Sequence, residues 1–244
     1  MKKGYGIFGK PYEIMLKNDL HDTASVDHEL MRNMILLDEE SVQFLYETPH
    51  AADMRSHELY QFAQQFRTSE DKKSIRNVLD FTSSIAEQYQ TDFRDMYFGG
   101  TEKQILERKT DWCADMARLG TVLLQSMGIP CRIIHLADLN RAFHGHAAGE
   151  AYYEGFYGVV DFIYGYMLYT NRPISARDII FNHTFPDGLP ESYRRLYSAV
   201  GISEYDPLDP ENDYTISKPN DYYLKLIYAD HRDRWIMGED EVEC

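Results

Sequence analysis

Cysteine is scarce in this sequence: Cys113, Cys131 and Cys244 are the only three among 244 residues. Three thiols cannot all pair with one another, and they have neither the density of a disulfide framework nor the C-x-x-C spacing of a metal knuckle. We therefore expect no disulfide scaffold. A reducing compartment, and so a cytoplasmic location, fits this cysteine usage best.

Long apolar runs and an excess of positive charge are also missing. No stretch reaches the roughly 18 apolar residues of a membrane-spanning helix, and Lys2 and Lys3 are not followed by the unbroken apolar region of a signal peptide. Lys and Arg number 25 against 40 Asp and Glu, so the formal net charge is −15. Because nucleic acids and anionic membranes are bound through clustered basic residues, we expect neither as a partner.

Apolar residues make up 43% of the chain, a share typical of globular proteins, and in the first third they follow a helical period. Spacings of three and four residues place them on one face of a helix, so they predict helices that pack on a core. The three stripes are Val26, Leu30, Met34 and Leu37; Leu59, Phe62, Ala63 and Phe66; and Ile75, Val78, Leu79, Thr82, Ile85, Ala86 and Tyr89.

After residue 130 the pattern changes to β-branched and aromatic runs, which predict strands over 131–139 and 146–165. Glu154-Gly155 interrupts the second run as a hairpin turn does. Further on, 190–201 and 220–235 are helical in pattern, and the turn-rich acidic segment 203–220 is expected to be a loop. With no repeat or linker, we expect one α+β domain over 1–244: an N-terminal helical region over 1–74, a core at about 75–164 and a C-terminal extension over 165–244.

Cys113 stands at the start of a predicted helix that runs to a C-cap at Gly128, with Pro130 preventing its continuation. A cysteine there is either a small packing residue or a nucleophile whose thiolate is stabilised by the free N–H groups and the dipole of the helix. Cys131 opens a strand and is expected to be structural. Cys244 is the last residue and is expected to be exposed.

His146 and Asp161 are brought together by the register of the predicted hairpin. A two-residue turn at Glu154-Gly155 pairs Tyr153 with Phe156, and this register puts His146 diagonal to Asp161 on one face. An aspartate in that position holds a histidine in one tautomer, and the histidine can activate a cysteine. Glu150 has the same strand parity as His146. It either faces the same cleft or forms a salt bridge.

The order of these motifs resembles the core of the transglutaminase-like superfamily, in its bacterial-type members. The matching residues are Cys113, "GIPCR" at 128–132, "HAAGE" at 146–150 and "VVD" at 159–161, preceded by the similar segment "TEKQILERKTDWC". The likeness covers roughly residues 75–164. The family often has an aromatic residue, a glycine and a proline where this chain has Ala148, Asp111 and Phe162.

The resemblance implies a papain-like α+β fold, in which a helix bearing the nucleophile packs on an antiparallel sheet with flanking helices. It implies a Cys113, His146 and Asp161 triad that transfers an acyl group from a peptide, protein or small amide, with no metal or organic cofactor. Hydrolysis is favoured over transamidation, since no dedicated amine site is evident.

Two neighbours of this triad are candidates for the substrate side or the oxyanion hole. Trp112 either donates from its indole N–H or packs over the site, and His144 is placed on the substrate side or in solvent. Two other functions stay open. One is a non-catalytic member of the fold that binds a peptide or protein. The other is a zinc hydrolase that uses Cys113, His144, His146 and Asp161. The sequence leaves the oligomeric state open.

Overall fold

An antiparallel sheet forms the centre of the computed structural model, which describes residues 34–47, 49–92, 94–138, 145–203, 205–209, 215–216 and 218. Its order is β1-β5-β2-β3-β4. The strands are β1 Met34–Leu36, β2 Cys131–Ala137, β3 Gly145–Tyr153, β4 Phe156–Val160 and β5 Ala199–Ser203. His144, Cys244, the helix expected over 220–235 and most of the stripe that starts at Val26 lie outside the described residues.

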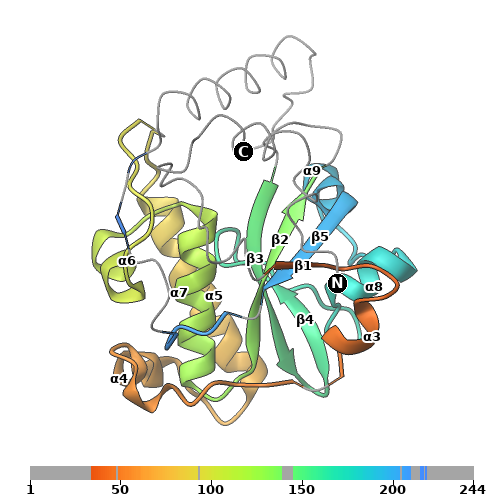
Figure 1. Cartoon of the computed structure of the whole chain (residues 1–244), viewed down its shortest axis with the longest axis horizontal. Helices are drawn as coiled ribbons and strands as arrows, with labels where there is room; N and C mark the ends of the chain where they lie inside the picture. Colours follow the sequence, from red (N-terminus) through yellow and green to blue (C-terminus); the bar gives the residue numbers. More distant parts are fainter. Residues whose placement is uncertain are drawn as a thin grey trace.

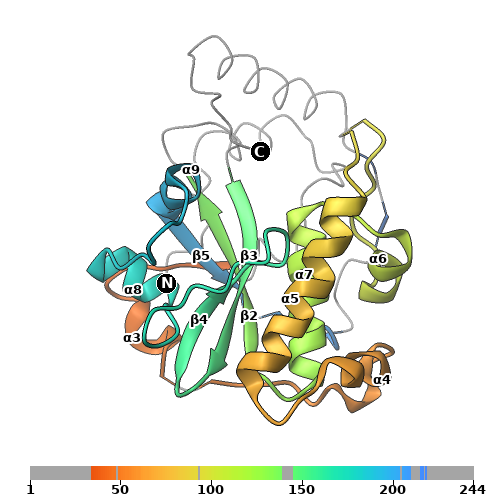
Figure 2. The same cartoon turned by 180° about the vertical axis from the view of Figure 1, so that it is seen from behind.

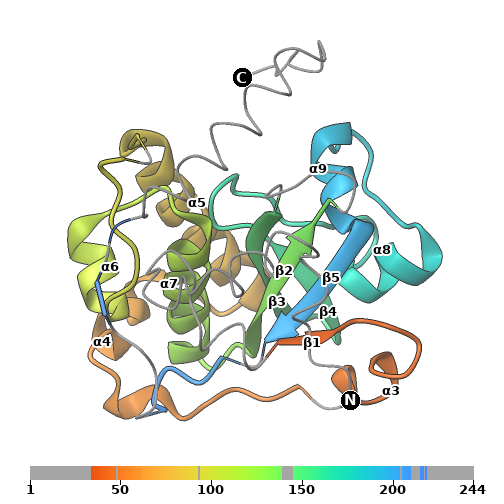
Figure 3. The same ribbon diagram turned by 45° about the horizontal axis from the view of Figure 1, so that its top comes forward.

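Helices cover the sheet on both sides (Figures 1 and 3). On one side lie α4 Tyr60–Ala63, α5 Asp71–Gln88, α6 Glu102–Arg108 and α7 Cys113–Ser126, with the 3-10 turns η3 Met54–Ser56 and η4 Gln64–Phe66. On the other side lie α3 Val42–Leu45, α8 Ala176–Asn182 and α9 Glu191–Arg195, which η5 Leu196–Ser198 joins to β5. The view from behind shows α5 and α7 running side by side along β3 (Figure 2).

Each side of the sheet has its own apolar core. One core joins α4, α5 and α7 to the sheet and includes Leu79, Leu123 and Ala151. The second joins the sheet to α3, α8 and α9 and includes Ala148, Ile179 and Val200. Ala148 and Ala151 differ in strand parity, so β3 contributes to both cores and is buried on both faces.

Helix α7 has the boundaries that its sequence predicts. It begins at Cys113 and ends at Ser126, and Gly128 follows with φ +76°. The N–H of Gly128 donates to the carbonyl of Gln125 at 2.8 Å and that of Ile129 to Leu124 at 3.1 Å, which satisfies the last free carbonyls. The end of the helix is therefore fixed by a glycine in the left-handed region.

The hairpin register predicted from Glu154-Gly155 is confirmed. Tyr153 pairs with Phe156, and the ladder continues to Gly149 opposite Val160. Glu154 and Gly155 both have positive φ, 51° and 84°, as the tight turn of a two-residue hairpin requires.

Phe162 stands where the family described above often has a proline, and its ring has a packing role in this fold. Its ring wedges between α7 and β3: a Cβ on Gly120 would lie 2.1 Å from Phe162 Cδ1, and one on Gly149 would lie 2.6 Å from Cε2. Both positions need glycine because the ring occupies the space of a side chain. The residue directly after Asp161 is thereby fixed against α7.

Three details of the predicted secondary structure are wrong. Residues Met34–Leu36, expected to end a helical stripe, form the edge strand β1. Residues 199–201, expected to end a helix, belong to β5, which pairs with both β1 and β2. Tyr89 lies beyond the end of α5 and is 37% exposed. In each strand a short apolar run has no period of its own, and pairing within the sheet decides its conformation.

The single-domain division over 1–244 stays a prediction. The sheet nevertheless extends beyond the expected core at 75–164, because β1 and β5 both come from outside it, and β5 lies between β1 and β2.

Candidate active site

Cys113 is the first residue of α7, and Trp112 is the N-cap. The cysteine is a free thiol and is only partly buried. The first N–H groups of a helix have no partner within the helix, and its N-terminus carries the positive end of the dipole. The fold therefore places the thiol where a negative charge on sulfur is favoured.

His146 joins Cys113 to Asp161. Its Nε2 lies 2.7 Å from Asp161 Oδ2, with 8% of the histidine side chain and none of the aspartate side chain exposed. The thiol of Cys113 is hydrogen-bonded to the same imidazole. Because Nε2 is engaged by Asp161, Nδ1 is the nitrogen left for a bond with the sulfur.

The Asp161 carboxylate is held by more than its histidine. The backbone N–H groups of Ile163 and Tyr164 both donate to Oδ1 at 2.9 Å. The hydroxyl of Tyr193 donates to Oδ2 at 2.6 Å. Four donors thus satisfy a fully buried charge, as burial of a carboxylate demands.

These contacts determine how the pair titrates. Burial alone would lower the pKa of His146, but the charge and hydrogen bond of Asp161, with a smaller contribution from Cys113, raise it to about 10. Burial alone would raise the pKa of Asp161. The charge of His146 and the hydrogen bonds from His146 and Tyr193 outweigh it and hold that pKa below its usual range. The pair is therefore an imidazolium and a carboxylate at neutral pH.

Aromatic rings enclose the histidine, and no motif in the sequence indicated them. The ring of Tyr164, 56% exposed, lies 5.3 Å from that of His146 between centroids. The ring of buried Tyr193 lies 6.1 Å from it. Tyr164 could have been noticed as the third residue after Asp161. Tyr193 comes from α9, and nothing near the motifs pointed to it.

Trp112 and His144 were the other candidates. The Trp112 ring packs on Phe98, with centroids 4.4 Å apart, which agrees with a packing role. Donation from its indole to an oxyanion stays a prediction. His144 lies outside the described residues, so its place on the substrate side also stays a prediction.

The zinc hydrolase alternative requires Cys113, His144, His146 and Asp161 as metal ligands. Among the residues that the structure describes, no group of three or more His, Cys, Asp and Glu side chains is arranged to hold a metal ion. Nε2 of His146 and Oδ2 of Asp161 are hydrogen-bonded to each other at 2.7 Å, instead of converging on a common point.

Glu150 does not join the site, although it shares strand parity with His146. It is fully buried, and Oε2 accepts hydrogen bonds from Arg132 at 2.9 and 2.7 Å. Oε1 accepts from the N–H of Ala176 at 2.8 Å. Cys131 is buried, and burial raises the pKa of its thiol to about 12, as fits a structural residue.

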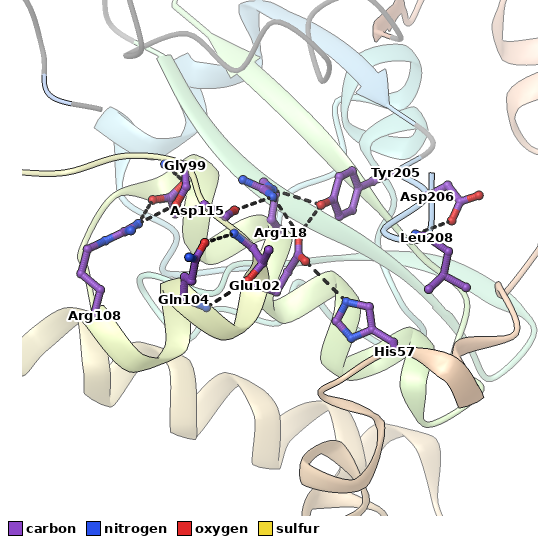
Figure 4. Close-up of polar contacts among 12 residues, drawn as sticks. His57, Gly99, Glu102, Gln104, Arg108, Asp115, Arg118, Tyr205, Asp206 and Leu208 are labelled. Atoms are coloured by element: carbon purple, nitrogen blue, oxygen red, sulfur yellow. Dashed lines mark hydrogen bonds and ion pairs between the residues drawn. The ribbon is translucent and has the colours of Figure 1, made fainter. Parts of the chain in front are cut away.

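A second polar cluster lies on the α6 side of α7 (Figure 4). Arg118, buried in α7, donates to Glu102 at 2.9 Å and to Tyr205 at 3.1 Å, and Tyr205 also donates to Glu102. Nearby, Arg108 donates to Asp115 at 2.7 Å. This cluster ties α6 and the residues after β5 to the helix that carries Cys113.

Comparison with known proteins agrees with this geometry. Residues 60–162 match the family model of the transglutaminase-like superfamily, a segment that contains Cys113, His146 and Asp161. A search of curated proteins found no match. None of the described helices has the length and apolarity to cross a membrane.

Three solved structures show limited likeness. A proposed cysteine protease from Cytophaga hutchinsonii has 22% identity and a TM-score of 0.35 over 52% of this chain and 43% of that one. A proposed protease from Parabacteroides distasonis has 15% identity and a TM-score of 0.32 over 48% and 28%. A structure described as a TGase has 14% identity and a TM-score of 0.34 over 90% and 52%. This chain covers about half or less of each of them.

The fold is thus an α+β fold with a papain-like core, a helix with a cysteine at its N-terminus packed on an antiparallel sheet. Residues 60–162, less than half of the chain, are similar to the transglutaminase-like superfamily.

Proposed function

We propose that this chain is a cysteine-dependent acyl-transfer enzyme that acts on a peptide or another amide, with hydrolysis favoured over transamidation. Cys113 is the nucleophile, His146 moves the proton and Asp161 orients and charges His146. The observation that carries the proposal is the chain of contacts from the thiol of Cys113 through His146 to Asp161, whose second link is 2.7 Å long. A thiol, a base and an orienting group are what nucleophilic cysteine catalysis needs.

The charge of His146 prepares the nucleophile. Asp161 keeps the imidazole protonated at neutral pH, and a cation next to the sulfur favours the thiolate. The positive end of the α7 dipole acts in the same direction. The reactive form is therefore a thiolate and imidazolium pair at the start of a helix.

Acyl transfer then proceeds in two steps, acylation of Cys113 and hydrolysis of the thioester. The sulfur of Cys113 attacks the amide carbonyl carbon, and the C–N bond breaks as His146 gives its Nδ1 proton to the leaving amine. A thioester remains. Water attacks the thioester, His146 takes a proton from that water, and the C–S bond breaks to release the acid and restore the thiolate.

The oxyanion of each tetrahedral intermediate needs donors. The free N–H groups at the start of α7 lie next to the sulfur, which makes them the first candidates. The indole of Trp112, the N-cap residue, is a second candidate. Both assignments belong to the proposal.

The first experiment measures alkylation of Cys113 by iodoacetamide against pH, with the modified site mapped by mass spectrometry. In the wild type we expect Cys113 to react at about pH 6, where a free cysteine is almost fully protonated. His146→Ala should lose that low-pH reactivity by at least about tenfold. Cys131 is an internal control, because it is buried and should stay unmodified at neutral pH in the same samples.

The second experiment tests turnover with a panel of fluorogenic peptide amides and, separately, with hydroxylamine as the acyl acceptor. Cys113→Ala should abolish any amide cleavage that the wild type shows. If a cleaved amide is found and Cys113→Ala still cleaves it, the proposed mechanism is wrong. A Cys113 that is accessible but alkylates like a free thiol in both the wild type and His146→Ala would favour the non-catalytic binding function. Stoichiometric zinc in purified protein would favour the zinc hydrolase.

A further inference from the structure

The Tyr193 hydroxyl reaches the site from a distant region of the chain. It lies on α9, beyond the segment 60–162 that matches the family, and its oxygen is 2.6 Å from Asp161 Oδ2. This is the same carboxylate oxygen that binds His146 Nε2 at 2.7 Å. Tyr193 and Asp161 are both buried, with 4% and 0% of their surface exposed.

We infer that Tyr193 is a positioning residue of the active site, one that donates to Asp161 and shares with His146 the oxygen through which Asp161 acts. The inference rests on the proposed function, because it names the residue that adjusts the proton chemistry of that site. Tyr193 acts through Asp161 and His146, and it is not itself a nucleophile or a base.

The carboxylate geometry shows what the hydroxyl adds. Oδ1 is already fixed by the two backbone N–H groups of Ile163 and Tyr164, so the carboxylate keeps its place without Tyr193. Oδ2 accepts hydrogen bonds from two donors, His146 and Tyr193. Each donor reduces the negative charge on Oδ2 that the other can use. The hydroxyl therefore weakens the hold of Asp161 on the His146 proton.

This effect matters for catalysis because His146 must release its proton to the leaving amine. A histidine paired with a fully buried carboxylate holds that proton tightly, as its raised pKa of about 10 indicates. A general acid works best when its proton affinity lies near the working pH. A second donor on Asp161 brings His146 closer to that condition.

Tyr193 stays a donor throughout the relevant pH range. Burial first, and then the negative charge of Asp161, raise the pKa of its hydroxyl well above the usual value. Its ring is packed by Tyr164 at 5.9 Å and Tyr166 at 5.2 Å, which fixes the position of the hydroxyl oxygen. Among the described residues, the titratable groups around His146 and Asp161 are Cys113 from α7, Tyr164 and Tyr166 from the segment after β4, Tyr193 from α9 and Tyr197 from η5.

The test follows the titration of His146 by NMR, with histidine labelled at Cε1, in the wild type and in Tyr193→Phe. Removal of the hydroxyl should move the His146 titration to higher pH by on the order of half a unit, about a threefold change in its protonation equilibrium. The low-pH limb of Cys113 alkylation should move to lower pH. Tyr166→Phe is the matched control: its ring also packs on Tyr193, but its hydroxyl is not bonded to Asp161.

A third variant keeps the ring and the hydrogen bond. With 3-fluorotyrosine at position 193 the hydroxyl is a stronger donor, so the His146 titration should move to lower pH, opposite to Tyr193→Phe. This variant also covers the case in which Tyr193→Phe does not fold, and a purely structural role would not produce opposite signs.

The outcomes separate the inference from the function on which it rests. A His146 titration that is the same in wild type, Tyr193→Phe and the fluorotyrosine protein overturns the role of Tyr193, whatever the alkylation shows. Alkylation of Cys113 that does not respond to His146→Ala overturns the proposed function instead.

Discussion

Two buried carboxylates lie on opposite sides of α7, and each accepts a hydrogen bond from a tyrosine. On the sheet side Asp161 accepts from Tyr193 and is paired with His146. On the α6 side Glu102 accepts from Tyr205 and is paired with Arg118. Each carboxylate also has a histidine partner, His146 for Asp161 and His57 for Glu102 at 3.5 Å. The difference is the arginine, which only the Glu102 cluster has and which stays charged at any pH that proteins tolerate. In the first cluster the histidine also contacts a thiol, so it can serve nucleophilic chemistry, whereas in the second the buried arginine keeps a permanent charge pair.

The largest expected effect comes from breaking the structural cluster. Arg118→Met leaves the buried Glu102 without its arginine partner and should lower the free energy of unfolding by about 3–5 kcal/mol. Urea denaturation measures this. The protein that remains folded should keep the pH profile of Cys113 alkylation.

The matched control is Arg67→Met, which removes an arginine from the half-exposed pair with Asp71. Exposed pairs contribute about 0–1 kcal/mol, so this variant should be close to the wild type. An Arg118→Met protein as stable as Arg67→Met, or one with a shifted alkylation profile, would contradict the assigned division of roles.

Asp161→Asn should have the next largest effect, and it acts on reactivity. Without the aspartate charge, burial lowers the pKa of His146, so the imidazole becomes neutral at neutral pH. Alkylation of Cys113 at about pH 6 should fall at least about tenfold. Asp80→Asn, an exposed carboxylate on α5, should leave the rate unchanged.

The same pair predicts how stability depends on pH. The folded pKa of His146 is raised, so its contribution is fully present below about 6.5 and is lost as pH rises through about 10. The folded pKa of Asp161 is lowered, so its contribution is present above about 4 and is lost in stronger acid. The stability difference between wild type and Asp161→Asn should therefore be largest between about pH 4 and 6.5 and should shrink on either side of this range. A difference that stays constant from acid to alkaline pH would refute the assignment.

Gly120→Ala tests the packing that joins α7 to the aspartate. The new methyl would overlap the Phe162 ring, which must move, at a cost of about 1–3 kcal/mol. Since Phe162 directly follows Asp161, we also expect a changed alkylation profile. Gly128→Ala is the control, because its Cβ would meet no atom within 4 Å and any cost there comes only from φ +76°. Thermal unfolding together with alkylation distinguishes the two.

The smallest expected effect is at the start of α6, the helix that carries Glu102. Thr101 caps this helix, and Gln104 accepts a hydrogen bond from the N–H of Thr101 at 2.9 Å. Thr101→Ala should cost about 1 kcal/mol and leave Cys113 reactivity unchanged. Thr101→Ser, which keeps the hydroxyl, should retain most of the stability.

Local patterns predicted the features of the site that lie close in sequence. The start and end of α7 follow from Cys113, Gly128 and Pro130, and the hairpin register follows from the turn at Glu154-Gly155. The same register placed His146 near Asp161, where the structure has them hydrogen-bonded. Each of these features depends on a capping residue, a turn or a two-residue period.

Contacts between distant segments could not be predicted in this way. Tyr193 is 32 positions from Asp161, and α9 is too short for its pattern to show what it packs against. Tyr205 is 103 positions from Glu102. The helical pattern over 190–201 runs into β5 because a short apolar run does not distinguish a buried strand from a helix. The docking of whole elements decided these positions.

The contact of Phe162 with Gly120 and Gly149 also constrains which sequences this site can accept. Alanine at position 120 overlaps the Phe162 ring and should be better tolerated beside a smaller side chain at 162, whereas a Cβ at position 149 would also lie 3.0 Å from Val160 Cγ2. Positions 120 and 162 should therefore change together. In a genetic screen, second-site suppressors of Gly120→Ala should be found at position 162, and their distance from Cys113 in sequence would give no hint of why they restore the protein.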